Sequence, residues 1–188
     1  MRYAYYARLT SRQQSIYRKS DAIGEIALPS AAALRALVEA LERALAAADR
    51  PAVERAAKAL AASLLVRLGT PPLRLRVLAV RPSDDWGELH GLYEPGEGRT
   101  LAAITLWMRT AQHRKVVAFR TFLRTLLHEL CHHLDYELFD LADSFHTAGF
   151  FKRESSLFKQ LVGAPEGRRP VKPLSRPARA AAASKDRR

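Results

Sequence analysis

Three neighbouring residues, His128, Glu129 and His132, have the types and the spacing of a metal site. On a helix, residues four positions apart lie one turn apart on the same face, so both imidazoles can face one ion. Neutral imidazoles suit Zn²⁺, which they bind at roughly 2.0–2.1 Å. Glu129 lies about 100° around the helix from His128, where its carboxylate can reach water beside the metal. The HExxH spacing therefore predicts metal-assisted hydrolysis with Glu129 as general base.

The residues around this motif predict one continuous helix that turns its histidines towards a cleft. No Pro or Gly interrupts residues 116–139, and leucines recur there at helical spacing. These leucines are Leu123, Leu127, Leu130 and Leu134. Their stripe is centred nearly opposite the two histidines. The alternative interpretation is a surface helix with two solvated histidines and a Glu. Cys131, towards the buried side, is expected to be a small core residue.

A catalytic zinc site needs a third protein ligand and one open position, and the segment after this helix offers two candidates. His146 follows His132 by fourteen positions, and Glu154 lies on the helix expected next. The short loop favours His146, because Gly149 would allow a turn just after it. Glu154 as the ligand would give a thermolysin-like, gluzincin-type peptidase instead. On the residues alone, both alternatives stay open.

The sequences HELCHHLD (128–135) and FHTAGFFK (145–152) together resemble the SprT-like, or Spartan-like, zinc metalloproteases. At the level of layout the resemblance extends over residues 73–161. It implies a zincin-like HExxH fold with Zn²⁺ as cofactor and a protein or peptide as substrate, DNA-associated proteins being one candidate class. It further implies that the ligands are His128, His132 and His146 and that the catalytic base is Glu129. The chain departs from the family pattern at Thr147, because a Gly usually follows the third His directly.

Other residues near the motif could orient the ligands or stabilise a developing oxyanion. For the first role Asp143 is favoured, because it lies near His146 in the sequence. The further candidates for that role are His133, Asp135 and Asp140. For the second role the candidates are Tyr136, Lys152 and Arg153, and the sequence selects none of them. For several of these carboxylates the favoured interpretation is a solvated loop position without an orienting role.

Charge is the strongest compositional bias, with a formal net charge of +12 at pH 7 over 188 residues. Residues 164–188 contribute eight Lys or Arg against Glu166 and Asp186, a net +6, and are rich in Pro and Ala. This composition predicts a disordered basic tail that can contact DNA phosphates without reading sequence. The candidate contacts are Arg168, Arg169, Lys172, Arg176 and Arg179. The alternatives are a solubilising tail, or a non-proteolytic module that keeps zinc as a structural element and binds nucleic acid.

The whole pattern predicts an α+β fold. We expect a basic, aromatic segment at 1–28, followed by a zincin-like metalloprotease domain at 29–163. Within that domain, Ala- and Leu-rich stretches predict a helical hairpin at 30–68. A change to period-two alternation predicts a small, mainly antiparallel sheet at 73–108. The metal-site helices are expected at 115–161.

Three strands are expected in the sheet, at Leu73–Ala79, Glu88–Tyr93 and Leu101–Met108. The last of these is the candidate edge strand that pairs with an extended substrate. Trp107 on it either lines the cleft or packs in the core, and the core position is favoured. Ahead of the sheet, Ser30 is expected to cap the first helix of the hairpin.

The remaining composition bounds the class of protein. One cysteine excludes an internal disulfide and fits a reducing cytoplasm. The first residues contain no apolar stretch of the signal-peptide type. No run of about 18 uncharged apolar residues occurs, so no membrane span is expected. The sequence favours a cytoplasmic protein and does not determine its oligomeric state.

Overall fold

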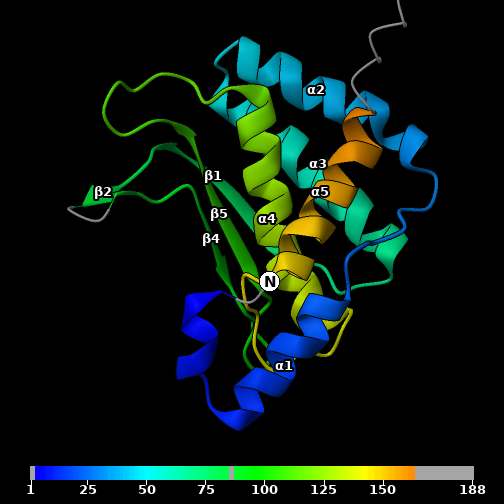
Figure 1. The fold of residues 1–188 in the computed structure, drawn as a ribbon. Coiled ribbons are helices and arrows are strands. Elements are labelled where there is room, and N and C mark those ends of the chain that lie inside the picture. Colours follow the sequence, from blue (N-terminus) through cyan, green and yellow to red (C-terminus); the bar gives the residue numbers. More distant parts are fainter. Residues whose placement is uncertain (1–2, 85–86, 164–188) are drawn as a thin grey trace, which may run out of the picture.

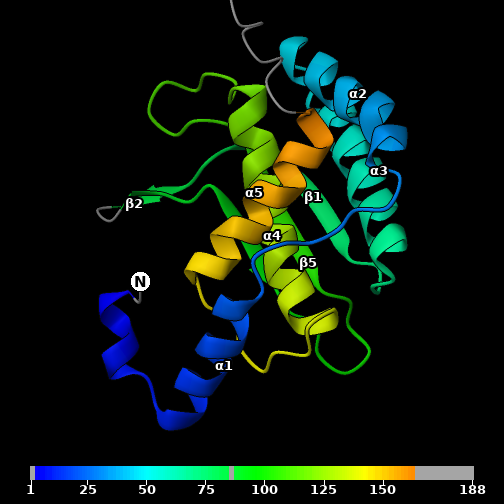
Figure 2. The same ribbon diagram turned by 45° about the vertical axis from the view of Figure 1, so that its right-hand side comes forward.

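The computed structural model describes residues 3–84 and 87–163, and this part of the chain has an α+β fold (Figure 1). The helices are η1 (Ala4–Arg8), α1 (Ser11–Ala22), η2 (Ala31–Leu34), α2 (Arg35–Ala46), α3 (Arg50–Leu68), α4 (Phe119–Glu137) and α5 (Ala148–Val162). The strands are β1 (Arg74–Val80), β2 (Ser83–Asp84), β3 (Gly87–Glu88), β4 (Gly91–Glu94) and β5 (Ala103–Arg109). Helices α2 to α5 gather on one side of the main sheet, as two views show (Figure 1 and Figure 2).

The main sheet is mixed and has the strand order β1–β5–β4. Strand β5 pairs in parallel with β1, with Val77 opposite Leu106, and antiparallel with β4, with Tyr93 opposite Ile104. The prediction of a mainly antiparallel sheet was therefore wrong. Between β1 and β5 the chain reverses direction twice, at the β2–β3 hairpin and again after β4. Two reversals leave β1 and β5 pointing the same way.

Strand β5 is the central strand, so the prediction that this segment forms the substrate-pairing edge was also wrong. Its residues are buried on both faces of the sheet, including Ile104, Leu106 and Trp107. A continuous apolar run of this kind suits a central strand better than an edge. Trp107 occupies the favoured core position. The short β4 is the edge that lies beside α4.

The expected helical hairpin is formed by α2 and α3, which pack against each other. Asp49 caps α3 by accepting a hydrogen bond from the Ala52 N–H at 3.1 Å. Gly69 ends the same helix in the left-handed conformation, at φ 65°. Ser30 does not act as the expected cap. It adopts φ 52° before η2, and its side chain makes no capping hydrogen bond.

The N-terminal segment is part of the same folded body. Helix α1 begins with a capping box between Thr10 and Gln13 and packs against α5. Helix α4 also packs against α5, and it buries its leucines, among them Leu123 and Leu127, in the common core. Cys131 is fully buried there, as a core residue. Within residues 3–84 and 87–163, no helix combines the length and hydropathy needed to cross a membrane.

Candidate metal centre

Three imidazoles from two elements meet at one point. His128 and His132 lie one turn apart on α4, and His146 comes from the loop between α4 and α5. The Nε2 atom of His146 lies 3.0 Å from Nε2 of His128 and 3.1 Å from Nε2 of His132. Donors bound tetrahedrally to zinc at roughly 2.0–2.1 Å are about 3.3 Å apart. The three histidines are therefore positioned to hold a metal ion.

The electrostatics of the cluster favour the neutral imidazoles that bind metals. Burial lowers the pKa of His132 to about 3, and the neighbouring His128 and His146 add to the effect. Burial also lowers the pKa of His146, with His128 as the next cause. Both rings are therefore neutral at pH 7. Their lone pairs are available without the loss of a proton.

Each histidine of α4 has a polar partner at its other ring nitrogen. Nδ1 of His128 lies 3.2 Å from a carboxylate oxygen of Glu154, and Nδ1 of His132 lies 2.7 Å from the hydroxyl of Ser144. Such contacts fix the ring orientation and leave Nε2 for the metal. Glu154 was the alternative third ligand. The structure instead places its carboxylate behind His128, where its second oxygen accepts a hydrogen bond from Arg124 at 3.1 Å.

A chain of polar groups leads from His132 into the core. The hydroxyl of Ser144 donates to Asp135 at 2.7 Å, and the other Asp135 oxygen accepts from Arg153 at 2.6 Å. Asp135 and Arg153 are both fully buried. Burial raises the pKa of Asp135, while the Arg153 charge opposes that rise. This chain links a candidate ligand to the core.

The favoured orienting residue, Asp143, does not contact a ligand ring. Its carboxylate accepts a hydrogen bond from the Ser144 backbone N–H at 2.9 Å. Sequence reasoning missed Ser144, because its role depends on the loop conformation. The sequence did indicate Asp135 as a candidate, since it follows His132 by three positions on the same helix. Asp140 is exposed at φ 48° in the same loop.

His133 supports the wall of the site and does not face the other three histidines. Its Nδ1 lies 3.2 Å from the Tyr93 hydroxyl, and its Nε2 lies 3.0 Å from the Pro71 carbonyl oxygen. The Tyr93 ring stacks on His132, with 6.2 Å between ring centroids, and on Tyr136. Strand β4 is thereby fixed against α4.

Glu129 lies beside the histidine cluster and is 6% exposed. Burial raises the pKa of its carboxyl to about 7, although the charge of His128 and a hydrogen bond from the Tyr93 backbone oppose the rise. The carboxylate fits against Gly91 of β4. A Cβ at that position would collide with Oε1 of Glu129 and lie 2.8 Å from the methyl group of Thr125. Glycine therefore lets the edge strand approach the proposed base.

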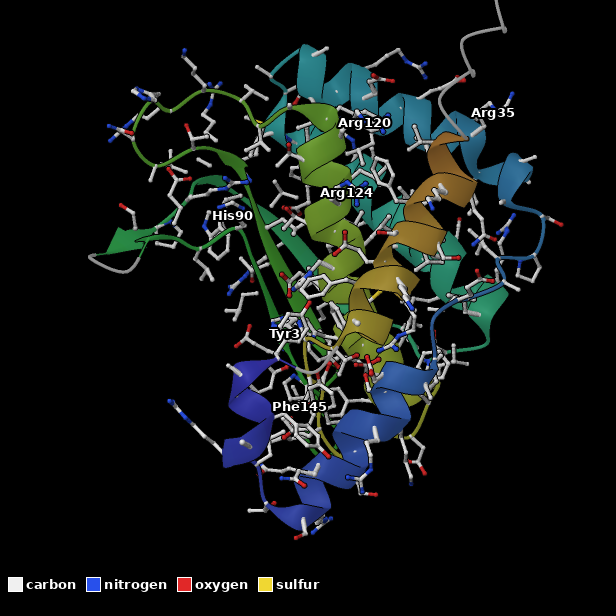
Figure 3. All side chains as sticks on the ribbon, in the orientation of Figure 1. Tyr3, Arg35, His90, Arg120, Arg124 and Phe145 are labelled. Carbon is white, nitrogen blue, oxygen red and sulfur yellow. The ribbon has the colours of Figure 1, made fainter. Side chains whose placement is uncertain are left out.

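The cluster opens into a cleft of about 700 Å³ between β4 and α4. Its lining includes His128, Glu129, His132, His146, Tyr93, Tyr136 and residues 88–92. Of the three candidate oxyanion donors, only Tyr136 lines this cleft. Arg153 is buried against Asp135, and Lys152 packs over Gly24 on another face. His90 and Arg124 both line this cleft, and Figure 3 shows His90 on the side of the sheet and Arg124 on α4.

Gly149 has a different role from the one expected. It lies inside the first turn of α5 and does not form a turn after His146. A Cβ there would lie 2.5 Å from the backbone oxygens of Ser20 and Asp21. Its N–H donates to the Asp21 side chain at 3.0 Å. The glycine therefore allows the end of α1 to pack directly on α5.

Comparisons of this chain with protein-family models, curated proteins and solved structures found no match. The interpretation of the site therefore depends on its own geometry. The predicted DNA contacts Arg168, Arg169, Lys172, Arg176 and Arg179 lie outside the described residues, as does the whole of 164–188.

Proposed function

We propose that this protein is a metal-dependent peptidase of the zincin type, with the SprT-like proteases as the family it resembles. The observation that carries the proposal is the juxtaposition of three converging histidines with a buried carboxylate at the floor of an open cleft. Among the described residues the metal-binding group contains three side chains, which is the ligand number of a catalytic zinc site. A structural site usually has four protein ligands, and this difference favours the enzyme over a non-proteolytic zinc module.

In this proposal His128, His132 and His146 hold a Zn²⁺ ion through their Nε2 atoms. Bound there, the ion would supply Lewis acidity towards the scissile carbonyl and would lower the pKa of a water molecule. Glu129 takes the proton from the attacking water and delivers it to the leaving amine. Burial holds the pKa of this carboxyl near 7, which suits both steps. Tyr136 is the donor best placed to stabilise the oxyanion, because it lines the cleft.

The substrate in this proposal is an extended polypeptide that pairs with β4. Among the described residues β4 pairs with β5 alone, so its other edge faces the cleft. Backbone pairing at a strand edge provides affinity without demanding particular side chains. Residues 89–92 line the cleft, and the side chains of Leu89 and Leu92 are 42% and 37% exposed. Apolar side chains of an unfolded protein would fit beside them.

The test is Glu129→Gln, measured alongside the wild-type chain for bound zinc and for cleavage of an unfolded protein such as casein. The amide preserves the shape of the side chain and removes the base. We expect about one zinc per chain in both proteins and hydrolysis in the wild type alone. Substitution of both His128 and His132 by Ala should remove stoichiometric zinc. Hydrolysis by the Gln variant at the wild-type rate would refute the mechanism. A zinc content of about one per chain in the double variant would refute the metal site.

A further inference from the structure

His146 is the least supported of the three histidines within its own element. The other two lie on the regular α4, whereas His146 is the central residue of a tight turn that the Thr147 N–H closes onto the Phe145 carbonyl at 2.7 Å. It is the most exposed of the three, and within the described residues neither of its ring nitrogens has a hydrogen-bond partner outside the cluster. Its position must therefore be set by what packs on the turn.

The N-terminal segment provides that support from 141 positions away in the sequence. The hydroxyl of Tyr5 donates to the His146 carbonyl oxygen at 3.0 Å. A tyrosine phenol keeps its proton at neutral pH, so this hydroxyl is available as a donor. This is a backbone contact, so it positions the turn and leaves the imidazole nitrogens free.

A second contact reaches the same histidine through aromatic rings. Tyr3 stacks on Tyr5, with 6.1 Å between centroids and 5° between planes. Its edge meets Phe151 at 6.4 Å, and Phe151 stacks on the His146 ring at 5.8 Å and 20°. The N-terminal segment thus touches both the backbone and the ring environment of the third histidine. In Figure 3 Tyr3 and Phe145 both lie below Arg120 and Arg124, towards the opposite end of α4.

The segment is itself fixed to the core by Tyr17, which is fully buried on α1. The Tyr17 ring contacts the rings of Tyr5, Tyr6 and Phe145, and its hydroxyl accepts from the Tyr3 backbone N–H at 3.3 Å. Aromatic pairs of this geometry stabilise a fold by more than the burial of their surface alone. The tyrosines of the basic, aromatic N-terminal segment therefore pack as an aromatic cluster on the turn.

We infer that residues 3–8 position the third metal ligand, and that Tyr5 is the positioning residue. The inference rests on the proposed function, since it takes His146 to be a ligand. It adds a condition that the HExxH motif does not contain: the centre is complete only when the N-terminus is folded onto the loop 138–147. Removal or displacement of the N-terminal segment would therefore weaken metal binding without a change in any of the three ligand residues.

The test compares Tyr5→Phe with wild type in the full-length chain. Zinc affinity is measured by competition with a chromophoric chelator, and Co²⁺ is then substituted so that its visible spectrum reports ligand geometry. We expect about three- to tenfold weaker zinc binding, the size of one lost hydrogen bond, together with an altered Co²⁺ spectrum. The matched control is Tyr6→Phe, which removes the neighbouring hydroxyl that accepts a hydrogen bond from Arg18 at 2.7 Å.

Three outcomes would count against this inference. Equal zinc affinity and equal Co²⁺ spectra for Tyr5→Phe and wild type would overturn it and leave the proposed metal centre standing. Equal losses in the Tyr5 and Tyr6 variants, with matching falls in the melting temperature of the metal-free chains, would show a general folding effect. A wild-type chain that binds no zinc would refute the proposed function, and this inference with it.

Discussion

At the residue scale, the site depends on which nitrogen of each imidazole is left free. Ser144 and Glu154 occupy the Nδ1 sides of His132 and His128, so both rings present Nε2 to the same point. His146, from the loop between α4 and α5, places its own Nε2 beside the other two. The motif supplies two of these rings and the proposed base, while the contacts behind the rings come from residues outside it.

His146 and Glu154 were rival candidates for the third ligand, and their substitution separates the two roles. His146→Ala removes a ring that contributes to the histidine cluster, so we expect zinc affinity to fall by more than about 100-fold. Glu154→Ala removes the partner behind His128, together with the acceptor of Arg124, but no cluster ring, and such losses cost about 10–100-fold. Zinc titration with a competing chelator measures the zinc affinity of both variants. A larger loss in the Glu154 variant would make that carboxylate the ligand.

Gly91 offers a test of the proposed base that leaves the base itself unchanged. Gly91→Ala places a methyl group against the Glu129 carboxylate and must displace either that side chain or β4. A displacement of about 1 Å from productive geometry can cost about 100-fold in rate. We expect kcat/KM to fall by about that factor while zinc remains bound. Gly24→Ala is the control, because its added Cβ meets only Lys152 at an ordinary 3.5 Å. Equal activity of the Gly91 variant and wild type would contradict the assigned geometry.

At the element scale, Arg153 joins three helices near the site. From α5 it donates to Asp135 on α4 and to the backbone carbonyls of Ser20 and Ile23 at the end of α1. Arg153 and Asp135 are both fully buried. An ion pair of this kind adds little net stability compared with an apolar pair, yet it is costly to break. It orients Asp135 towards Ser144 and fixes the three helices to one another.

Arg153→Met should therefore destabilise the fold by about 3–5 kcal/mol, because Asp135 would be left buried without its partner. Urea denaturation of the metal-free chain measures the change in the free energy of unfolding. The control Arg43→Met removes an exposed partner of Glu39 on α2. That change should stay within about 0.5 kcal/mol. A loss below about 1 kcal/mol for Arg153→Met would show that the buried pair does not hold the helices together.

The sequence predicted those features that local periodicity controls. The helical spacing around His128 and the apolar stripe of Leu123 and Leu127 gave α4 and the orientation of its histidines. The sequence did not predict the strand order, because the parallel pairing of β1 with β5 depends on two chain reversals between the strands. The roles of Ser144 and Gly149 were likewise set by which segments meet in the folded chain.

At the scale of the whole molecule, the remaining feature is the net charge of +12, half of it within residues 164–188. The histidine cluster lies entirely in the described body, between α4 and the loop 138–147. Deletion of 164–188 should therefore leave zinc binding and peptide hydrolysis unchanged. Any contribution of this segment to DNA binding is then measurable separately from the chemistry of the site.

We expect the full-length chain to bind duplex DNA weakly and without sequence preference, because phosphate contacts by Lys and Arg carry no sequence information. Each such contact contributes about 0.9 to the slope of log K against log salt. Deleting 164–188 removes a net +6 and should flatten that slope and weaken binding. Titration of a labelled duplex at several salt concentrations, with both chains in parallel, measures the change. If the full-length chain shows no binding even near about 50 mM salt, where screening is modest, the excess charge serves solubility and not DNA recognition.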